Sequence, residues 1–154
     1  MKLATLCYII DREKNSTLML HRIKKENDIH EGKWNGLGGK FEPNETPEEC
    51  VIREVEEESG LIISSPHLHG LITFPLFDGK DDWYVFLFTA DKFEGALMTS
   101  DEGHLEWIHN DEIPSLNLWE GDQIFIPWLF GKKFFSAKFV YNNKKLTDFN
   151  VNFY

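Results

Sequence analysis

A short helix that crowds carboxylates onto one face is the feature that most constrains this chain. Thr46 suits the N-cap of that helix, Pro47 its first position and Gly60 its end. Glu49 follows Thr46 at the spacing of a capping box. Because each residue turns a helix by about 100°, side chains at i, i+3 and i+4 share a face. Three glutamates have this spacing (Glu54, Glu57 and Glu58), and an apolar stripe lies beside them (Val51, Ile52 and Val55).

The three glutamates have two interpretations. Like charges at helical spacing repel each other weakly, so the cluster is locally unfavourable. A hard divalent cation would convert that repulsion into coordination, and Mg²⁺ binds a few carboxylates together with substrate phosphates. The alternative is a solvated acidic face, which is the usual meaning of a run of charges. Spacing alone leaves both interpretations open.

Size and composition fit a single globular domain over residues 1–154. The chain is 42% hydrophobic, which is enough for a packed core. Its net charge of −10 argues against a nucleic-acid polymer as ligand, because a protein needs an excess of basic side chains to displace counterions from that backbone. A small polyphosphate needs only local cations, so a nucleotide is still allowed.

The cysteines and the apolar runs indicate the compartment. Cys7 and Cys50 are too few for a disulfide framework or a zinc site, and we interpret them as reduced, buried thiols. The apolar run 3–10 is short and lacks a cleavage site, so a strand is favoured over a signal peptide. No run reaches transmembrane length. We expect a cytoplasmic protein with no membrane partner, as a monomer or weak dimer.

The order of expected elements implies an α+β fold, with a mixed sheet between helices. Residues 3–10 and 17–22 predict a hairpin, and 23–33 a charged loop. A second helix is expected over 119–130, with Gly131 at its end. The other expected strands are 68–77, 83–90, 105–109, 134–141 and 146–154, the last two forming a closing hairpin.

The stretch Gly39–Leu61 resembles the Nudix box, G-x5-E-x7-R-E-U-x-E-E-x-G-U, where U is aliphatic. A chance match at every fixed position is about one in a million for a chain this long. The flanking residues are similar to MutT-type Nudix hydrolases through 34–40, Asp101-Glu102 and Trp119-x-x-Asp122, so the likeness covers almost the whole chain. The matching box residues are Gly39, Glu45, Arg53, Glu54, Val55, Glu57, Glu58, Gly60 and Leu61.

This resemblance implies a fold and an activity. The fold is the Nudix α/β/α sandwich. The activity is Mg²⁺-dependent hydrolysis of oxidised purine nucleoside triphosphates, such as 8-oxo-dGTP, to the monophosphate and pyrophosphate, with Mn²⁺ as a substitute metal; such enzymes sanitise the nucleotide pool. Two alternatives stay open. One is a Nudix hydrolase of another nucleoside diphosphate derivative, such as ADP-ribose or a dinucleotide polyphosphate; the other is a non-catalytic nucleotide-binding module.

The resemblance also assigns catalytic roles. Arg53 would orient the glutamates by bidentate pairing, with Glu45 as a supporting carboxylate. The group that takes the proton from water would be a glutamate, and the sequence does not separate Glu57, Glu58 and Glu102. The implied catalytic set is Arg53, Glu54, Glu57, Glu58 and Glu102, and the implied metal ligands are Glu54, Glu57, Glu58, Glu102 and the Gly38 carbonyl.

The same resemblance places the base against Asn35, Trp119 and Asp122, where indole stacking would be combined with amide and carboxyl hydrogen bonds. One departure is present: a human member of the family has two adjacent aspartates, whereas this chain has Gly121 before Asp122. That departure weakens the case for oxidised adenine nucleotides. Isolated histidines, His30 among them, receive no catalytic role. The remaining substrate contacts would come from Gly39, Lys40 and Arg22, although a surface salt bridge is an equal interpretation for the arginine.

We predict that Glu54→Gln and Glu58→Gln each abolish turnover while leaving the fold intact, because an amide cannot replace a carboxylate as a ligand or base. Steady-state kinetics and circular dichroism of the two variants test this prediction. Near-normal activity in both variants would remove the acidic helix from the mechanism.

Overall fold

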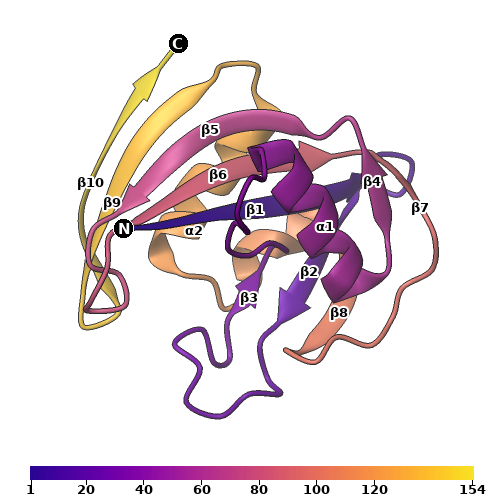
Figure 1. Cartoon of the computed structure of the whole chain (residues 1–154), viewed down its shortest axis with the longest axis horizontal. Coiled ribbons are helices and arrows are strands. Elements are labelled where there is room, and N and C mark those ends of the chain that lie inside the picture. Colours follow the sequence, from indigo (N-terminus) through magenta and orange to yellow (C-terminus); the bar gives the residue numbers. More distant parts are fainter.

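The computed structural model describes residues 1–154, which fold around one eight-stranded mixed sheet (Figure 1). The strand order is β10-β9-β5-β6-β1-β2-β3, and β8 pairs with β2. The strands are β1 (Lys2–Asp11), β2 (Ser16–His21), β3 (Trp34–Asn35), β5 (His67–Phe74), β6 (Trp83–Ala90), β8 (His104–His109), β9 (Phe135–Asn142) and β10 (Lys145–Phe153). A separate two-stranded sheet pairs β4 (Ile62–Ser64) with β7 (Lys92–Glu94).

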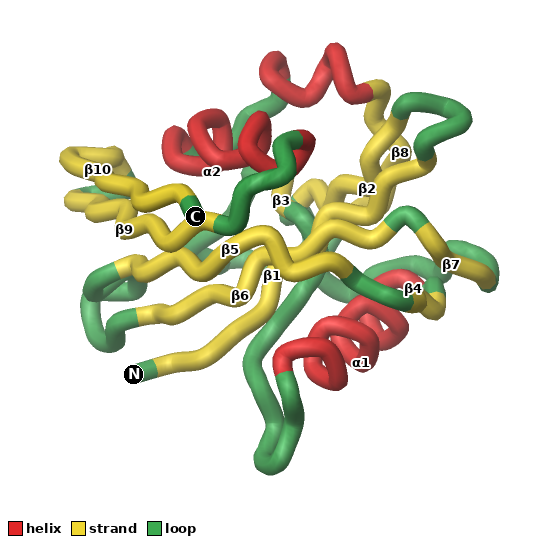
Figure 2. The backbone as a smooth tube through the Cα atoms, turned by 90° about the horizontal axis from the view of Figure 1, so that it is seen from above, coloured by secondary structure: helices red, strands yellow, loops and turns green.

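Helices cover both faces of the sheet. Figure 2 shows α1 (Pro47–Ser59) on one side, and α2 (Glu120–Phe125) on the other. Alternate residues of β1 face the two layers, as the two-residue period of a strand requires: Ile9 packs in the α1 core and Tyr8 in the α2 core. This arrangement confirms the expected α+β sandwich. No helix has the length and apolar character of a membrane span.

Strand β1 positions the glycine-rich segment 36–40. Residues 2–9 of β1 pair in parallel with β6, but β2 pairs only with the last part of its other edge, residues 9–11. The glycine-rich segment runs beside the remainder, where the Cys7 amide donates to the Leu37 carbonyl and the Thr5 amide to the Gly39 carbonyl. A side chain at Gly38 would run into the Thr5 carbonyl, so this close approach requires glycine. The start of the box is thereby fixed to the sheet.

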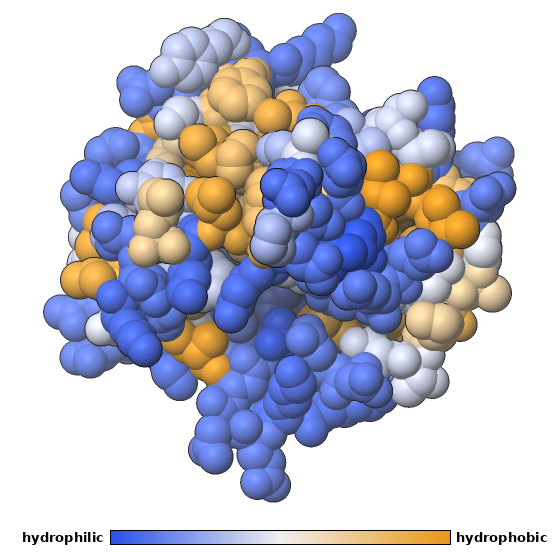
Figure 3. All heavy atoms as spheres, viewed as in Figure 1, coloured by the Kyte–Doolittle hydropathy of each residue, from blue (hydrophilic) through white to orange (hydrophobic).

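The helix α1 forms as its sequence predicts. The Thr46 hydroxyl accepts the Glu49 amide at 3.1 Å, and the Glu49 carboxylate accepts the Thr46 amide at 3.4 Å, which completes the capping box. Gly60 ends the helix in the left-handed region at φ 81°. Val51 and Val55 are fully buried against the sheet. Hydrophilic side chains gather over the outward side of α1 (Figure 3).

Two expected elements were wrong at their ends. The strand expected over 68–77 ends at Phe74, and Phe77 lies in the turn that follows. In this turn Leu76 has a positive φ of 46°, which a strand does not allow. The helix expected over 119–130 is α-helical only to Phe125 and continues as the 3-10 helix η2 (Ile126–Phe130). Pro127 explains this change, because proline has no amide proton to donate to the α-helical ladder.

Three further short elements had no clear signal in the sequence: β4, β7 and the 3-10 helix η1 (Asn110–Ser115). The expected closing hairpin is confirmed as β9 and β10, joined by a turn in which Asn143 and Lys144 both have positive φ. The first hairpin is confirmed as β1 and β2. The segment 22–33 between β2 and β3 has no strand or helix and hangs below them in Figure 1.

We predict that Thr46→Ala lowers the free energy of unfolding by about 1 kcal/mol, because the Glu49 amide loses its capping acceptor. Urea unfolding of the purified chain measures this loss. Thr46→Ser retains a hydroxyl at the same place and is the matched control. An equal loss in both variants would contradict a capping role.

Candidate active site

One cavity of about 530 Å³ brings together residues that are far apart in the sequence. Carboxylates from α1 and from the loop before β8 lie at one end, and a group of aromatic and polar side chains lies at the other. Gly38, Gly39 and Lys40 line the cavity between them. Of the predicted site residues, the cavity is lined by Arg22, Asn35, Gly38, Gly39, Lys40, Glu54, Glu58, Glu102, Trp119 and Asp122, and not by Arg53 or Glu57.

Arg53 lies behind the carboxylates and pairs with several of them. Its Nε and Nη2 atoms donate to the two oxygens of Glu45 at 2.6 and 2.9 Å, the bidentate geometry that only a guanidinium provides. Its Nη1 atom donates to Glu54 at 2.8 Å and to Glu57 at 3.2 Å. The hydrogen bonds from Arg53 lower the pKa of Glu45 to about 2. Arg53 therefore fixes Glu54 from outside the cavity, and Glu57, which is 58% exposed, lies on the same outer side.

Glu58 is the most perturbed carboxylate. Burial, and then the negative charges of Glu102 and Glu54, raise its pKa to about 9. Burial also raises the pKa of Glu54, although the Arg53 hydrogen bond opposes that shift. The Oε2 atom of Glu58 is buried without a hydrogen-bond partner. Without a cation, the Glu58 carboxyl is therefore protonated and neutral at pH 7.

These residues fit a hard divalent cation. All the donors are oxygens, which Mg²⁺ prefers, and a cation would give the unpaired Oε2 atom of Glu58 a partner. Gly39 leaves room for the Glu54 carboxylate, which occupies the space of a β-carbon. No three acidic, histidine or cysteine side chains already converge as a metal site, so the carboxylates would turn toward an ion on binding.

Two further predicted ligands come from outside α1. Glu102 precedes β8 and lies 3.5 Å from both Arg22 and Lys25. Gly38 lies in the glycine-rich segment, between two residues whose carbonyls accept hydrogen bonds from β1. Arg22 is held mainly by Asp28, with an Nε to Oδ2 distance of 2.9 Å. The arginine thus forms the predicted salt bridge while also lining the cavity.

The other end of the cavity is aromatic. Trp119 is only 3% exposed, and its ring centroid lies 4.9 Å from Phe77 and 5.4 Å from Tyr141, both edge-to-face. Its Nε1 atom donates to Nδ1 of His30 at 2.9 Å. Burial, and then the charge of Arg22, lower the pKa of His30 to about 4, so the ring is neutral at pH 7 and can accept this bond.

Two polar groups at this end lack protein partners. The Nδ2 atom of Asn35 is buried and makes no hydrogen bond. Asp122 is 6% exposed, and burial raises its pKa to about 7, against the opposing charge of Lys33. Buried polar groups left unpaired are costly, so a ligand with complementary hydrogen-bonding atoms would be stabilised here.

The packing explains why glycine precedes Asp122. The Gly121 amide donates to the Tyr141 hydroxyl at 2.7 Å. A β-carbon at position 121 would lie 2.7 Å from that hydroxyl and 2.9 Å from the Phe139 ring, too close for a side chain. The tyrosine hydroxyl therefore occupies the space that a second acid would need.

Sequence reasoning missed four residues near the site: Asp28, His30, Phe77 and Tyr141. Phe77 had been placed in a strand and Tyr141 at the end of another, where aromatic residues are ordinary core. His30 and Asp28 lie in an irregular charged loop, whose path the sequence does not predict. Only the fold brings these side chains to the cavity, and no local motif marks them.

Comparison with known proteins agrees with this geometry. Residues 1–129 match the model of the NUDIX domain family. The chain belongs to the Nudix family. It is 37% identical over 115 residues to the oxidized purine nucleoside triphosphate hydrolase of Danio rerio, covering 75% of this chain and 74% of that protein. The corresponding hydrolase of Mus musculus is 35% identical over 120 residues, covering 78% and 77%.

A solved structure extends the match to nearly the full length. The Nudix hydrolase described here superposes on the MutT protein of Bacillus halodurans with a TM-score of 0.86 and 30% identity, covering 99% of this chain and 98% of the other. The Nudix fold expected from the box is therefore confirmed. The acidic helix α1 forms the second half of the Nudix box. Its Glu54 and Glu58 side chains line the cavity.

The pH dependence of stability tests the burial of Asp122. Its pKa is raised from 3.8 to about 7 in the folded chain, so folding takes up a proton between these values and wild-type stability falls as pH rises through them. We predict that the free energy of unfolding of Asp122→Asn, minus that of wild type, increases from pH 4 to pH 7 and is constant above. Urea unfolding across this range measures it.

Asp91→Asn is the matched control. The Arg12 hydrogen bond lowers the pKa of Asp91, so its contribution changes only below its ordinary value of 3.8. Its difference from wild type should therefore be flat from pH 4 to pH 7. Parallel curves for the two variants would contradict the raised pKa of Asp122.

Proposed function

We propose that this Nudix hydrolase cleaves oxidised purine (deoxy)nucleoside triphosphates, such as 8-oxo-dGTP, to the monophosphate and pyrophosphate, with Mg²⁺ as cofactor. One observation carries the proposal: a single cavity is lined by acidic residues suited to the phosphates and metal and by a group of aromatic and polar residues suited to a base. The two hydrolases named for oxidised purine nucleotides, at 37% and 35% identity, support the same substrate class.

The roles of the acidic residues follow from their places. Glu54, Glu58 and Glu102 would hold the cation, and Arg53 would fix the orientation of Glu54. When bound, Mg²⁺ supplies positive charge to the phosphates and makes a water molecule more acidic. Glu58 and Glu102 line the cavity, whereas Glu57 faces outward, which favours the first two as the acceptor of the water proton.

The polar residues of the pocket would select the base. Stacking on Trp119 contributes about 1–3 kcal/mol and tolerates many bases. Selection must therefore come from polar groups that an unsuitable base leaves unpaired, namely the Asn35 amide, whose Nδ2 atom has no protein partner, and the buried Asp122 carboxyl. With a pKa of about 7, Asp122 can present a protonated carboxyl as a donor near neutral pH. A base with adjacent acceptor and donor atoms would pair with both groups, accepting from the Asn35 Nδ2 atom and donating to the acceptor oxygen of the Asp122 carboxyl.

This function would place the protein in nucleotide pool sanitation, and so in the prevention of mutation in DNA. We propose that it acts in the cytoplasm, as one domain of residues 1–154 and as a monomer or weak dimer. A soluble nucleotide is the only partner that the mechanism requires.

Parallel kinetics test the proposal. We predict that kcat/KM for 8-oxo-dGTP exceeds that for dGTP by about tenfold or more, because only the preferred base would pair with both polar groups. 2-Hydroxy-dATP and ADP-ribose complete the substrate series, and the products should be the monophosphate and pyrophosphate. Chelation with EDTA should abolish turnover, and Mg²⁺ or Mn²⁺ should restore it. Preference for ADP-ribose would overturn the substrate assignment.

A further inference from the structure

A single carboxylate in the segment 22–33 is engaged at both of its oxygens. The side chain of Asp28 is 10% exposed. Its Oδ2 atom accepts from the guanidinium of Arg22 at 2.9 Å, and its Oδ1 atom accepts the backbone amide of His30 at 3.2 Å. Arg22 and His30 both line the cavity, whereas Asp28 does not. Asp28 therefore contacts two residues that line the cavity, Arg22 and His30, without lining it itself.

The Arg22 branch leads to the carboxylate end. The Nη1 atom of Arg22 lies 3.5 Å from Glu102, a longer contact than the 2.9 Å to Asp28. Because Asp28 holds the guanidinium more closely, Glu102 keeps only two longer contacts, each 3.5 Å, to Arg22 and Lys25, which a divalent cation could displace. With Asp28 uncharged, Arg22 would pair fully with Glu102 and compete with the cation for it.

The His30 branch leads to the base end. The Nδ1 atom of His30 accepts from Trp119 at 2.9 Å, and its ring stacks on Phe77 with centroids 5.8 Å apart. The hydrogen bond fixes the plane of the indole, on which the base would stack. Because Asp28 holds the backbone of His30, it determines where that acceptor lies.

We propose that Asp28 is a positioning residue that fixes both ends of the cavity, keeping Glu102 available to a cation through Arg22 and keeping Trp119 oriented through His30. The choice of nucleotide probe rests on the proposed function. Asp28 touches neither substrate nor cation in this account. Its effects on cation binding and on base binding are indirect. The first acts through Arg22 and the second through His30, so the two effects can be measured separately.

Two binding measurements, made without turnover, test the proposal. Mn²⁺ affinity is measured by electron paramagnetic resonance without nucleotide, and 8-oxo-dGMP affinity by calorimetry in EDTA. Asp28→Asn should weaken Mn²⁺ binding about tenfold or more, the usual effect of losing a residue that orients a ligand. It should also weaken 8-oxo-dGMP binding about fivefold, through looser stacking. His30→Ala should weaken only 8-oxo-dGMP binding.

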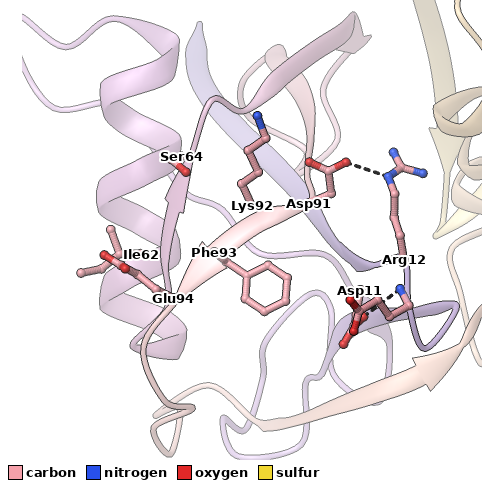
Figure 4. A pocket seen from close by; sticks show the side chains of 9 residues that line it. Asp11, Arg12, Ile62, Ser64, Asp91, Lys92, Phe93 and Glu94 are labelled. Atoms are coloured by element: carbon pink, nitrogen blue, oxygen red, sulfur yellow. Dashed lines mark hydrogen bonds and ion pairs between the residues drawn. The ribbon is translucent and has the colours of Figure 1, made fainter.

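A rescue separates positioning from general damage. If Arg22 competes for Glu102 in Asp28→Asn, then adding Arg22→Gln should return Mn²⁺ affinity to within about twofold of wild type, while 8-oxo-dGMP binding stays weak. Asp91→Asn is the matched control, because it also removes an Arg–Asp pair, Arg12 to Asp91 at 2.7 Å, in a separate pocket beside β7 (Figure 4). It should change neither affinity.

Unchanged affinities in folded Asp28→Asn, or a double variant that stays weak for Mn²⁺, would overturn the proposal. If Asp28→Asn does not fold, the single variants decide it: His30→Ala must spare Mn²⁺ binding, and Arg22→Gln must not weaken it. A wild-type chain that binds Mn²⁺ but not 8-oxo-dGMP would count against the proposed substrate alone. The base end is then measured with the monophosphate product of whichever substrate the kinetic series identifies.

Discussion

The burial of Glu58 beside Glu54 and Glu102 is the constraint on which the candidate site depends, and the fold imposes it. The helix α1 cannot turn Glu54 and Glu58 outward, because Val51 and Val55 on its other face are buried against the sheet. Burial first, and then the charges of Glu102 and Glu54, disfavour the ionised form of Glu58, and its buried Oε2 atom has no partner in the protein. Arg53 stabilises only the outer side, through Glu45 and Glu54. In the proposed function, a bound cation would offset the cost left at the inner side.

The central strand β1 makes this arrangement rigid. It pairs with β6 along one edge and shares the other between β2 and the glycine-rich segment, so the start of the box is part of the sheet rather than a free loop. The segment 22–33 also lines the cavity, and its own backbone hydrogen bonds, such as Arg22 to Lys33, close it as a loop rather than as a strand of the sheet. The two walls therefore differ: one is part of the sheet, and the other is a loop whose cavity side chains are held by Asp28.

The sequence was most informative where structure is local. The capping box of α1, the two hairpins and the Nudix box all depend on residues within a few positions of each other, and each was predicted. The helix predicted over 119–130 is α-helical only to Phe125, because Pro127 cannot donate to the α-helical ladder. The strand to Phe77 failed because the apolar pattern continues into a turn. His30, Phe77 and Tyr141 could not be assigned to the cavity, since their proximity to Trp119 depends on the path of three separate segments.

Tyr141 lies in β9, beyond residue 129, where the match to the family model ends. Its hydroxyl nevertheless accepts the Gly121 amide and fills the space beside Asp122. In the proposed function, the carboxylates that act at the phosphates lie in α1, whereas one residue that shapes the base pocket lies in the C-terminal hairpin. Changes in the C-terminal hairpin could alter which nucleotide is preferred without touching the catalytic helix, a modularity through which related enzymes could diversify.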